Sequence, residues 1–270
     1  MSSKTDLPGV IKRTILLFVC AVLVLFLSVF IFESSRNNAV KIIRALGLEN
    51  ASAAKILDRK VFLIDLFGGL PVGRAVMTNN GLVTLKDKEV YQCSGQAQTF
   101  GLAALLFNAQ AKVSSYIDKN TLLPLLFKET LSRPDSPVET KEIVYDHENL
   151  IMEVKGIKRQ ILPGTQDPFS VMYYLSRQSF EPGKEFDMNI NTNQKNYRFF
   201  LKVSKREEQI VNGRKIGIWI VKGDIKRRDK SPRHTTNLTM WLLDNGEKTP
   251  IFIKVVASGL PVTARLIEVQ

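Results

Sequence analysis

Two residue types that could take part in a hydrolytic triad stand together in the stretch GTQDPFSVMYYLSRQ. Asp167 and Ser170 would supply the acid and the nucleophile, and the chain has two histidines, His147 and His234. A triad serine of the elbow type sits on a sharp turn that glycines flank, and Ser170 lies between Phe169 and a valine. We therefore assign no catalytic residue to this stretch.

The same residues are better explained as the start of a buried helix. Asp is a favoured N-cap, and Pro is favoured at the first helical position, so Asp167 and Pro168 predict a helix start. Phe169, Met172 and Tyr173 then share one face, and further apolar residues cover most of the rest. A short helix that is apolar nearly all round belongs inside a protein. The stretch is predicted to be structural.

Residues 15–32, ILLFVCAVLVLFLSVFIF, carry no charge. A bilayer-spanning helix needs roughly 17–25 apolar residues, whereas the apolar core of a cleaved signal peptide is about 7–15 residues long. An uncleaved signal anchor is therefore favoured over a cleaved peptide. Lys12 and Arg13 directly precede the run, which favours a cytoplasmic tail and a domain facing the periplasm or the cell exterior.

The remainder of the chain shows the alternation and the closely spaced turns of short antiparallel strands. Helical spacing appears inside it only at Phe100–Gln110 and in the stretch described first. We predict a mainly β fold, with one large curved antiparallel sheet or half-barrel, short helices packed on its concave face, and a transmembrane helix before it. The expected parts are a basic tail at 1–14, the anchor at 15–32, a juxtamembrane helical linker at 33–60 and the β domain at 61–270.

The charge and the cysteine content limit the partners. The net charge of +12 and the pI of 9.7 favour anionic partners. Six cations, the first of them Lys222, gather in KGDIKRRDKSPRH, which is otherwise explained as a solvated hairpin loop. Five of them are candidate contacts for an anionic head group: Lys226, Arg227, Arg228, Lys230 and Arg233. No aromatic residue interrupts this run, so nucleic acid is not expected. With two cysteines and two histidines, no metal or other cofactor is expected.

Several motifs in order resemble a known family: GGLPVGRA, YQCSGQAQT, VSSYIDKNTLLPLLFKE, IVYDHEN, TQDPFSVMYYLS, NGRKIGIWIV and MWLLDNGEKTPIFIKV. Together they resemble the bacterial domain-of-unknown-function family 3108 over about 61–269. The resemblance implies an exported envelope protein without an established activity, and a fold similar to that of the lipoprotein-carrier proteins. An anchored chain would differ from a carrier, because it could not shuttle across the periplasm.

These observations predict a non-catalytic domain of the bacterial inner membrane, held by residues 15–32, that binds a lipid or another acyl-bearing ligand. Besides the five cations, the candidate contacts are Phe100, Leu105, Phe169, Met172 and Tyr173. The helix at Phe100–Gln110 either completes the core or covers an apolar cavity as a lid. One alternative is an adaptor that binds another envelope protein, and a third is an enzyme of unknown class.

Overall fold

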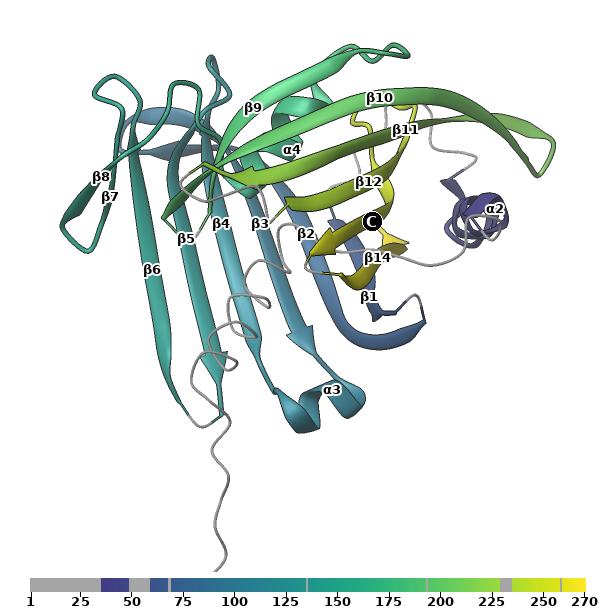
Figure 1. The fold of residues 1–270 in the computed structure, drawn as a ribbon, viewed down its shortest axis with the longest axis horizontal. Helices are drawn as coiled ribbons and strands as arrows, with labels where there is room; N and C mark the ends of the chain where they lie inside the picture. Colours follow the sequence, from purple (N-terminus) through teal and green to yellow (C-terminus); the bar gives the residue numbers. More distant parts are fainter. Residues whose placement is uncertain are drawn as a thin grey trace, which may run out of the picture.

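The computed structural model describes residues 35–48, 59–67, 69–134, 136–192, 194–228, 235–257 and 259–270. In this part of the chain, fourteen strands form one antiparallel sheet, which curves without closing into a barrel (Figure 1). The strands are β1 (Arg59–Leu66), β2 (Leu70–Leu85), β3 (Lys88–Thr99), β4 (Gln110–Asp118), β5 (Pro124–Arg133), β6 (Ser136–Asp146), β7 (Ile151–Val154), β8 (Ile157–Gln160), β9 (Glu185–Thr192), β10 (Lys195–Val211), β11 (Arg214–Arg227), β12 (Thr235–Leu243), β13 (Pro250–Ala257) and β14 (Leu260–Val269).

The strands follow a meander order, except that β8 and β9 do not pair with each other. Each strand pairs with its sequence neighbour, β1 pairs with β14, and the two edges of the sheet are β8 and β9. Helix α4 (Pro168–Ser176) lies between those two edge strands in the sequence. Just before it, Gln166 makes a single parallel bridge to Ile190 on the β9 edge, with its N–H donating to Asn189 O at 2.8 Å. The segment that leads into α4 therefore pairs with the β9 edge of the sheet.

The hairpins β4–β5 and β6–β7 form their turns with the same type of side-chain hydrogen bond. Asp118 Oδ1 accepts hydrogen bonds from the backbone N–H groups of Asn120 and Thr121 at 2.9 and 2.8 Å, after β4. Asp146 Oδ1 accepts from Asn149 N–H at 2.9 Å, after β6. An aspartate that bonds the backbone two or three residues later replaces the ladder bonds that end there. The turns are therefore specified locally.

The three described helices have different surroundings. Helix α4 lies inside the bend of the sheet (Figure 1), and most of its side chains are buried. Helix α2 (Ser35–Ala45) falls in the predicted linker and packs on β10, β13 and β14, with Ile43 fully buried. Helix α3 (Gly101–Leu106) is shorter than the predicted Phe100–Gln110. It sits between the ends of β3 and β4, and it does not cover the concave face.

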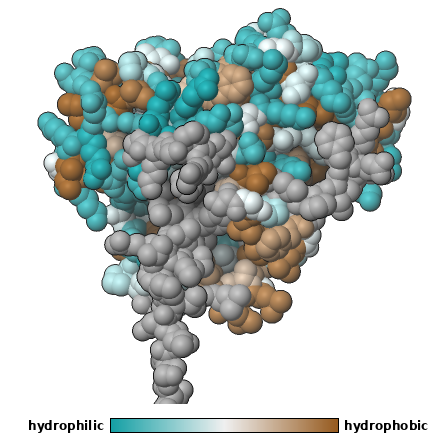
Figure 2. Space-filling model, in the orientation of Figure 1, coloured by the Kyte–Doolittle hydropathy of each residue, from teal (hydrophilic) through white to brown (hydrophobic). Residues whose placement is uncertain are grey.

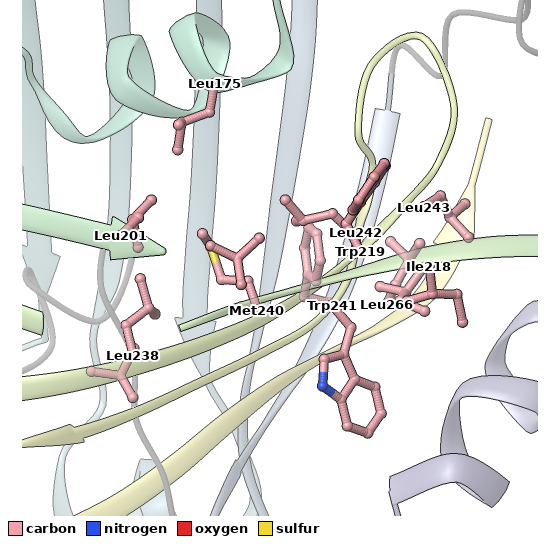
Figure 3. Close-up of a cluster of buried hydrophobic side chains, with 14 of the residues drawn as sticks. Leu175, Leu201, Ile218, Trp219, Leu238, Met240, Trp241, Leu242, Leu243 and Leu266 are labelled. Carbon is pink, nitrogen blue, oxygen red and sulfur yellow. The ribbon is translucent and has the colours of Figure 1, made fainter. Parts of the chain in front are cut away.

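The core divides into two main clusters that meet at α4. Phe169 and Tyr173 join a cluster formed with β3 to β7, while Val171 and Leu175 join a larger one with α2, β1, β2 and β9 to β14. Figure 3 shows Leu175 pointing toward Met240 in the larger cluster. The prediction of a helix that is buried on nearly all sides is confirmed.

The predicted tail at 1–14 and the predicted anchor at 15–32 lie outside the described residues. Among the residues that are described, no helix is both long enough and apolar enough to span a bilayer. The mainly β, single-sheet architecture is confirmed.

A candidate ligand pocket beside helix α4

Helix α4 is held at its N-terminus by a buried capping box. Asp167 Oδ1 accepts from the N–H groups of Phe169 and Ser170 at 2.7 and 2.8 Å, and Asp167 N–H donates to Ser170 Oγ at 2.8 Å. The other carboxylate oxygen accepts from the Ser115 hydroxyl on β4 at 2.5 Å. Asp167 and Ser170 therefore fix the helix to the sheet, as the N-cap prediction requires.

Burial raises the pKa of the Asp167 carboxyl, and the hydrogen bonds from Ser115, Ser170 and Phe169 oppose that rise. Burial, followed by the charge of Asp167, also raises the pKa of Tyr145 well above its usual value. His147 lies in the β6–β7 turn, where its Nε2 is 2.8 Å from Pro124 O. His234 lies outside the described residues. These contacts do not place an imidazole on Ser170.

Gly95 on β3 makes room for the helix. A Cβ added at Gly95 would lie 2.5 Å from Phe169 Cζ, closer than two carbon atoms approach. Phe169 is 3% exposed, so its ring has little freedom to move away. The helix can approach β3 this closely because the sheet offers a position without a side chain.

A pocket of about 270 Å³ lies along one face of α4. Its walls come from β1, β2, β3, α4 and the turn between β12 and β13. The less polar part of the wall consists of Met77, Cys93, Phe169, Met172, Tyr173 and Pro250. Burial is the main reason that the pKa of the Cys93 thiol is raised to about 12, so this thiol stays protonated at neutral pH.

Cationic side chains outnumber acidic ones around the pocket. Lys60, Arg177 and Lys248 line it together with one acid, Glu247, whose Oε2 is 3.0 Å from Lys60 Nζ. Lys248 Nζ donates to the carbonyl of Ser176 in the last turn of α4 at 3.3 Å. Burial lowers the pKa of Lys248. The pocket therefore combines an apolar wall with a basic one.

Tyr173 and Arg177 form one corner of the pocket, and Tyr91 packs against both of them. The Tyr91 and Tyr173 rings lie 4.8 Å apart, and Arg177 Cζ lies 5.1 Å from the Tyr173 ring centre. An Arg177 guanidinium nitrogen donates to the Tyr173 hydroxyl at 2.7 Å. Burial raises the pKa of Tyr173 to about 12, and the neighbouring Arg177 opposes the rise. Arg177 is thus held in place by a hydrogen bond and a ring face.

Residues 61–261 match a family described as "Protein of unknown function (DUF3108)". The chain belongs to the DUF3108 family. Among solved structures, a beta-barrel-like DUF1849 protein from Brucella abortus is similar, with a TM-score of 0.55 and 13% identity over 78% of this chain and 96% of that one. The hypothetical lipoprotein YmcC from Escherichia coli matches with a TM-score of 0.31 and 10% identity over 80% of this chain and 90% of that one. No curated protein matches the chain.

The fold of this DUF3108 domain separates the predicted ligand contacts. Phe169, Met172 and Tyr173 all line the pocket, on the face of α4 that the helical spacing predicted. Phe100 and Leu105 lie instead at α3, where Leu105 is 82% exposed. They are not part of the pocket lining.

The basic run is also placed differently from the expected loop. Lys226 and Arg227 belong to β11, which extends further than the hairpin reading assumed. Arg228 follows the strand and donates to Asn189 Oδ1 at 2.5 Å. Lys230 and Arg233 lie outside the described residues. None of the three described cations lines the pocket.

The cations that do line the pocket were not predicted. Arg177 lies at the C-terminal end of α4, Lys60 at the start of β1, and Lys248 after the Asp-Asn-Gly turn that ends β12. The sequence indicates only that Arg177 lies near Tyr173, because the two residues are four positions apart at the end of one helix. Lys60 and Lys248 come close to Arg177 only through the pairing of distant strands in the sheet.

Proposed function

We propose that this domain is a non-catalytic envelope module that binds a small amphiphile in the pocket beside α4. The observation that carries the proposal is the pocket itself, with Met172 and Phe169 on its apolar wall and Arg177 and Lys248 on its basic wall. An acyl chain would displace water from the apolar wall, worth about 0.8 kcal/mol per buried methylene. A carboxylate or phosphate head group would face the cations.

The size of the pocket favours a ligand with a single chain. Its volume of about 270 Å³ is near the lower end of the roughly 300–1,000 Å³ that small-molecule sites occupy. A two-chain lipid would not fit without movement of the surrounding side chains. A fatty acid, a lysolipid or one chain of a larger lipid matches the volume better.

The apolar run at 15–32 supports an envelope location and a signal anchor, with this domain facing the periplasm or the cell exterior. A tethered domain would present or hold its ligand at the membrane rather than carry it across the periplasm. The resemblance to lipoprotein-carrier proteins would then concern the fold alone.

A second candidate function is that of an adaptor for another envelope protein. It is favoured by the packing on both sides of α4, where Leu175 and Phe169 are 1% and 3% exposed and belong to the two core clusters. In that case the pocket would be a packing defect, and the partner would bind elsewhere on the surface.

Native mass spectrometry of the full-length protein, released from membranes in detergent, distinguishes the two functions. We expect a stoichiometric amphiphile that is retained in Met188→Gln and lost in Met172→Gln. Both methionines are half-buried, but only Met172 lines the pocket. Lys248→Gln should reduce occupancy by an anionic ligand. A clean ligand-free mass in every preparation would contradict the binding function.

A further inference from the structure

Exposed apolar side chains gather at one end of the sheet, away from the residues of the pocket. The β1–β2 turn contributes Phe67 and Leu70, which are 62% and 48% exposed. Helix α3 contributes Leu102 and Leu105, which are 70% and 82% exposed. We call these four residues the apolar tip. Exposure of this degree in four large apolar side chains is unusual unless the surface meets another phase or partner.

The segments of the apolar tip are connected in space. Phe100 N–H, next to α3, donates to Val72 O on β2 at 3.1 Å, and α3 packs on β2. Phe67 N–H donates to Pro261 O at 2.8 Å, which adds the start of β14. Figure 2 shows hydrophobic residues gathered at the corresponding end of the molecule, over α3 and the start of β2. The tip is therefore one surface and not scattered residues.

The charge pattern around the tip identifies the kind of partner. The chain carries no charge over 66–73, 90–111 and 255–264, which are the three stretches that meet there. Leaving the tip along β2, β4, β13 and β14, the first charged residues are Arg74, Lys112, Lys254 and Arg265. All four are cations.

Two of the four cations are paired with acids of the sheet. Arg74 Nη2 lies 2.8 Å from Glu268 Oε2 on β14. Asp65 on β1 is 1% exposed, and its Oδ2 accepts from Arg265 Nε at 2.8 Å. The other two cations are lysines. An uncharged tip bordered by two lysines matches a bilayer whose head groups are anionic, because long cationic side chains can reach head groups while apolar side chains enter below them.

We propose that the apolar tip docks into the surface of a bilayer that contains anionic lipid. Leu102 and Leu105 enter the head-group and upper acyl region, and Lys112 and Lys254 contact the head groups. This surface is separate from the pocket, so docking does not depend on the proposed ligand function. It assigns α3 a role at the membrane surface, in place of the predicted cover for an interior cavity.

The test measures the depth of single labels in the full-length protein, reconstituted in vesicles of phosphatidylcholine with phosphatidylglycerol. A polarity-sensitive fluorophore is attached at Leu102→Cys or, as the matched control, at Ile210→Cys on β10, since these side chains are 70% and 68% exposed. The background carries Cys20→Ser and keeps Cys93, which is buried. Lipids brominated along the acyl chain serve as quenchers.

We expect the label at position 102 to be quenched several-fold more strongly than the label at position 210. Vesicles of phosphatidylcholine alone, or Lys112→Gln with Lys254→Gln, should reduce that quenching. Circular dichroism of each variant checks the fold. Equal, weak quenching at both positions would overturn the proposal. So would a label at position 102 that is shielded from a water-soluble quencher without being quenched by lipid, because a protein surface would then cover the tip.

Discussion

The two short helices inside the β domain have similar apolar composition and opposite surroundings. Helix α4 is buried along most of its length, and Phe169 is 3% exposed. Helix α3 projects at the end of the strands, and Leu105 is 82% exposed. The N-cap of α4 is an aspartate with a complete capping box, whereas that of α3 is Phe100, which makes no side-chain cap bond.

This comparison shows that apolar content does not distinguish an interior helix from an exposed one. The N-cap residue distinguishes the two helices better. Asp167 ends the preceding extended segment, and its carboxylate accepts a hydrogen bond from Ser115 on the sheet. Gly95 provides the space that α4 needs. Helix α3 has neither a cap nor a matching glycine on a neighbouring strand. Whether a helix is buried therefore depends on the neighbouring strands more than on the apolar content of the helix.

Truncation of one apolar side chain from each helix should give the largest contrast. Phe169→Ala should lower the free energy of unfolding by about 3–5 kcal/mol, because it leaves a cavity in a packed cluster. Leu102→Ala should change it by no more than about 0.5 kcal/mol, because the side chain is exposed. Urea titrations followed by tryptophan fluorescence measure both. Similar losses for the two variants would mean that α3 is buried in solution.

Substitution of Gly95 tests the space that receives α4. Gly95→Ala should lower the free energy of unfolding by about 1–3 kcal/mol, because the new Cβ overlaps the Phe169 ring. Gly69→Ala is the control, since a Cβ there meets no atom within 4 Å. Thermal denaturation of the two variants gives the comparison. A Gly95→Ala protein as stable as the wild type would show that Phe169 can move aside.

Asp167 should contribute less to the free energy of unfolding than the Phe169 ring does. Asp167→Ala should lower the free energy of unfolding by about 0.5–2 kcal/mol, the usual range for a lost N-cap. Asp167→Asn keeps a good capping residue and has no charge to bury. Ser170→Ala removes only one side of the capping box. Urea titrations at pH 7 rank the three variants, and a catalytic role would instead leave all of them as stable as the wild type.

The pH dependence of the wild type relative to Asp167→Asn follows from the raised pKa of Asp167. A carboxyl whose pKa is higher in the folded state stabilises the fold when protonated. That contribution is complete below the unfolded pKa of about 3.9, and it is lost as the pH rises through the folded pKa. The wild type should therefore gain stability relative to Asp167→Asn as the pH falls from 7 toward 4. A constant difference across this range would contradict the burial argument.

Thiol labelling should show directly that the pocket wall is closed to solvent while α3 is exposed. Cys93 is 8% exposed and the pKa of its thiol is raised to about 12, so a maleimide should modify it only after unfolding. A cysteine at Leu105→Cys should react rapidly in the folded protein. Mass spectrometry at successive times follows both reactions in the Cys20→Ser background. Fast labelling of Cys93 in the native state would show that the pocket opens widely.

The single sheet, several of its turns and the buried face of α4 could be predicted because each depends on local signals. Closely spaced turns between alternating segments indicate hairpins, and the spacing of Phe169, Met172 and Tyr173 marks a helix face. Lys60 and Lys248 could not be predicted as pocket residues, because β1 is brought to the β12–β13 turn only through the pairing of β1 with β14. No residue near either lysine in the sequence carries that information.

Because β1 pairs with β14 in the middle of the sheet, the first and the last strand of this domain are both needed to complete the sheet. Arg59 and Gln270 exchange backbone hydrogen bonds of 3.2 and 3.0 Å at the outer end of these two central strands. During synthesis, β1 must wait for β14 before its second edge is covered, a long-range contact of the kind that slows folding. Loss of β14 would leave unpaired edges on β1 and β13 in the middle of the sheet, where other chains could add. A truncated product would therefore be prone to aggregate rather than merely lack one strand.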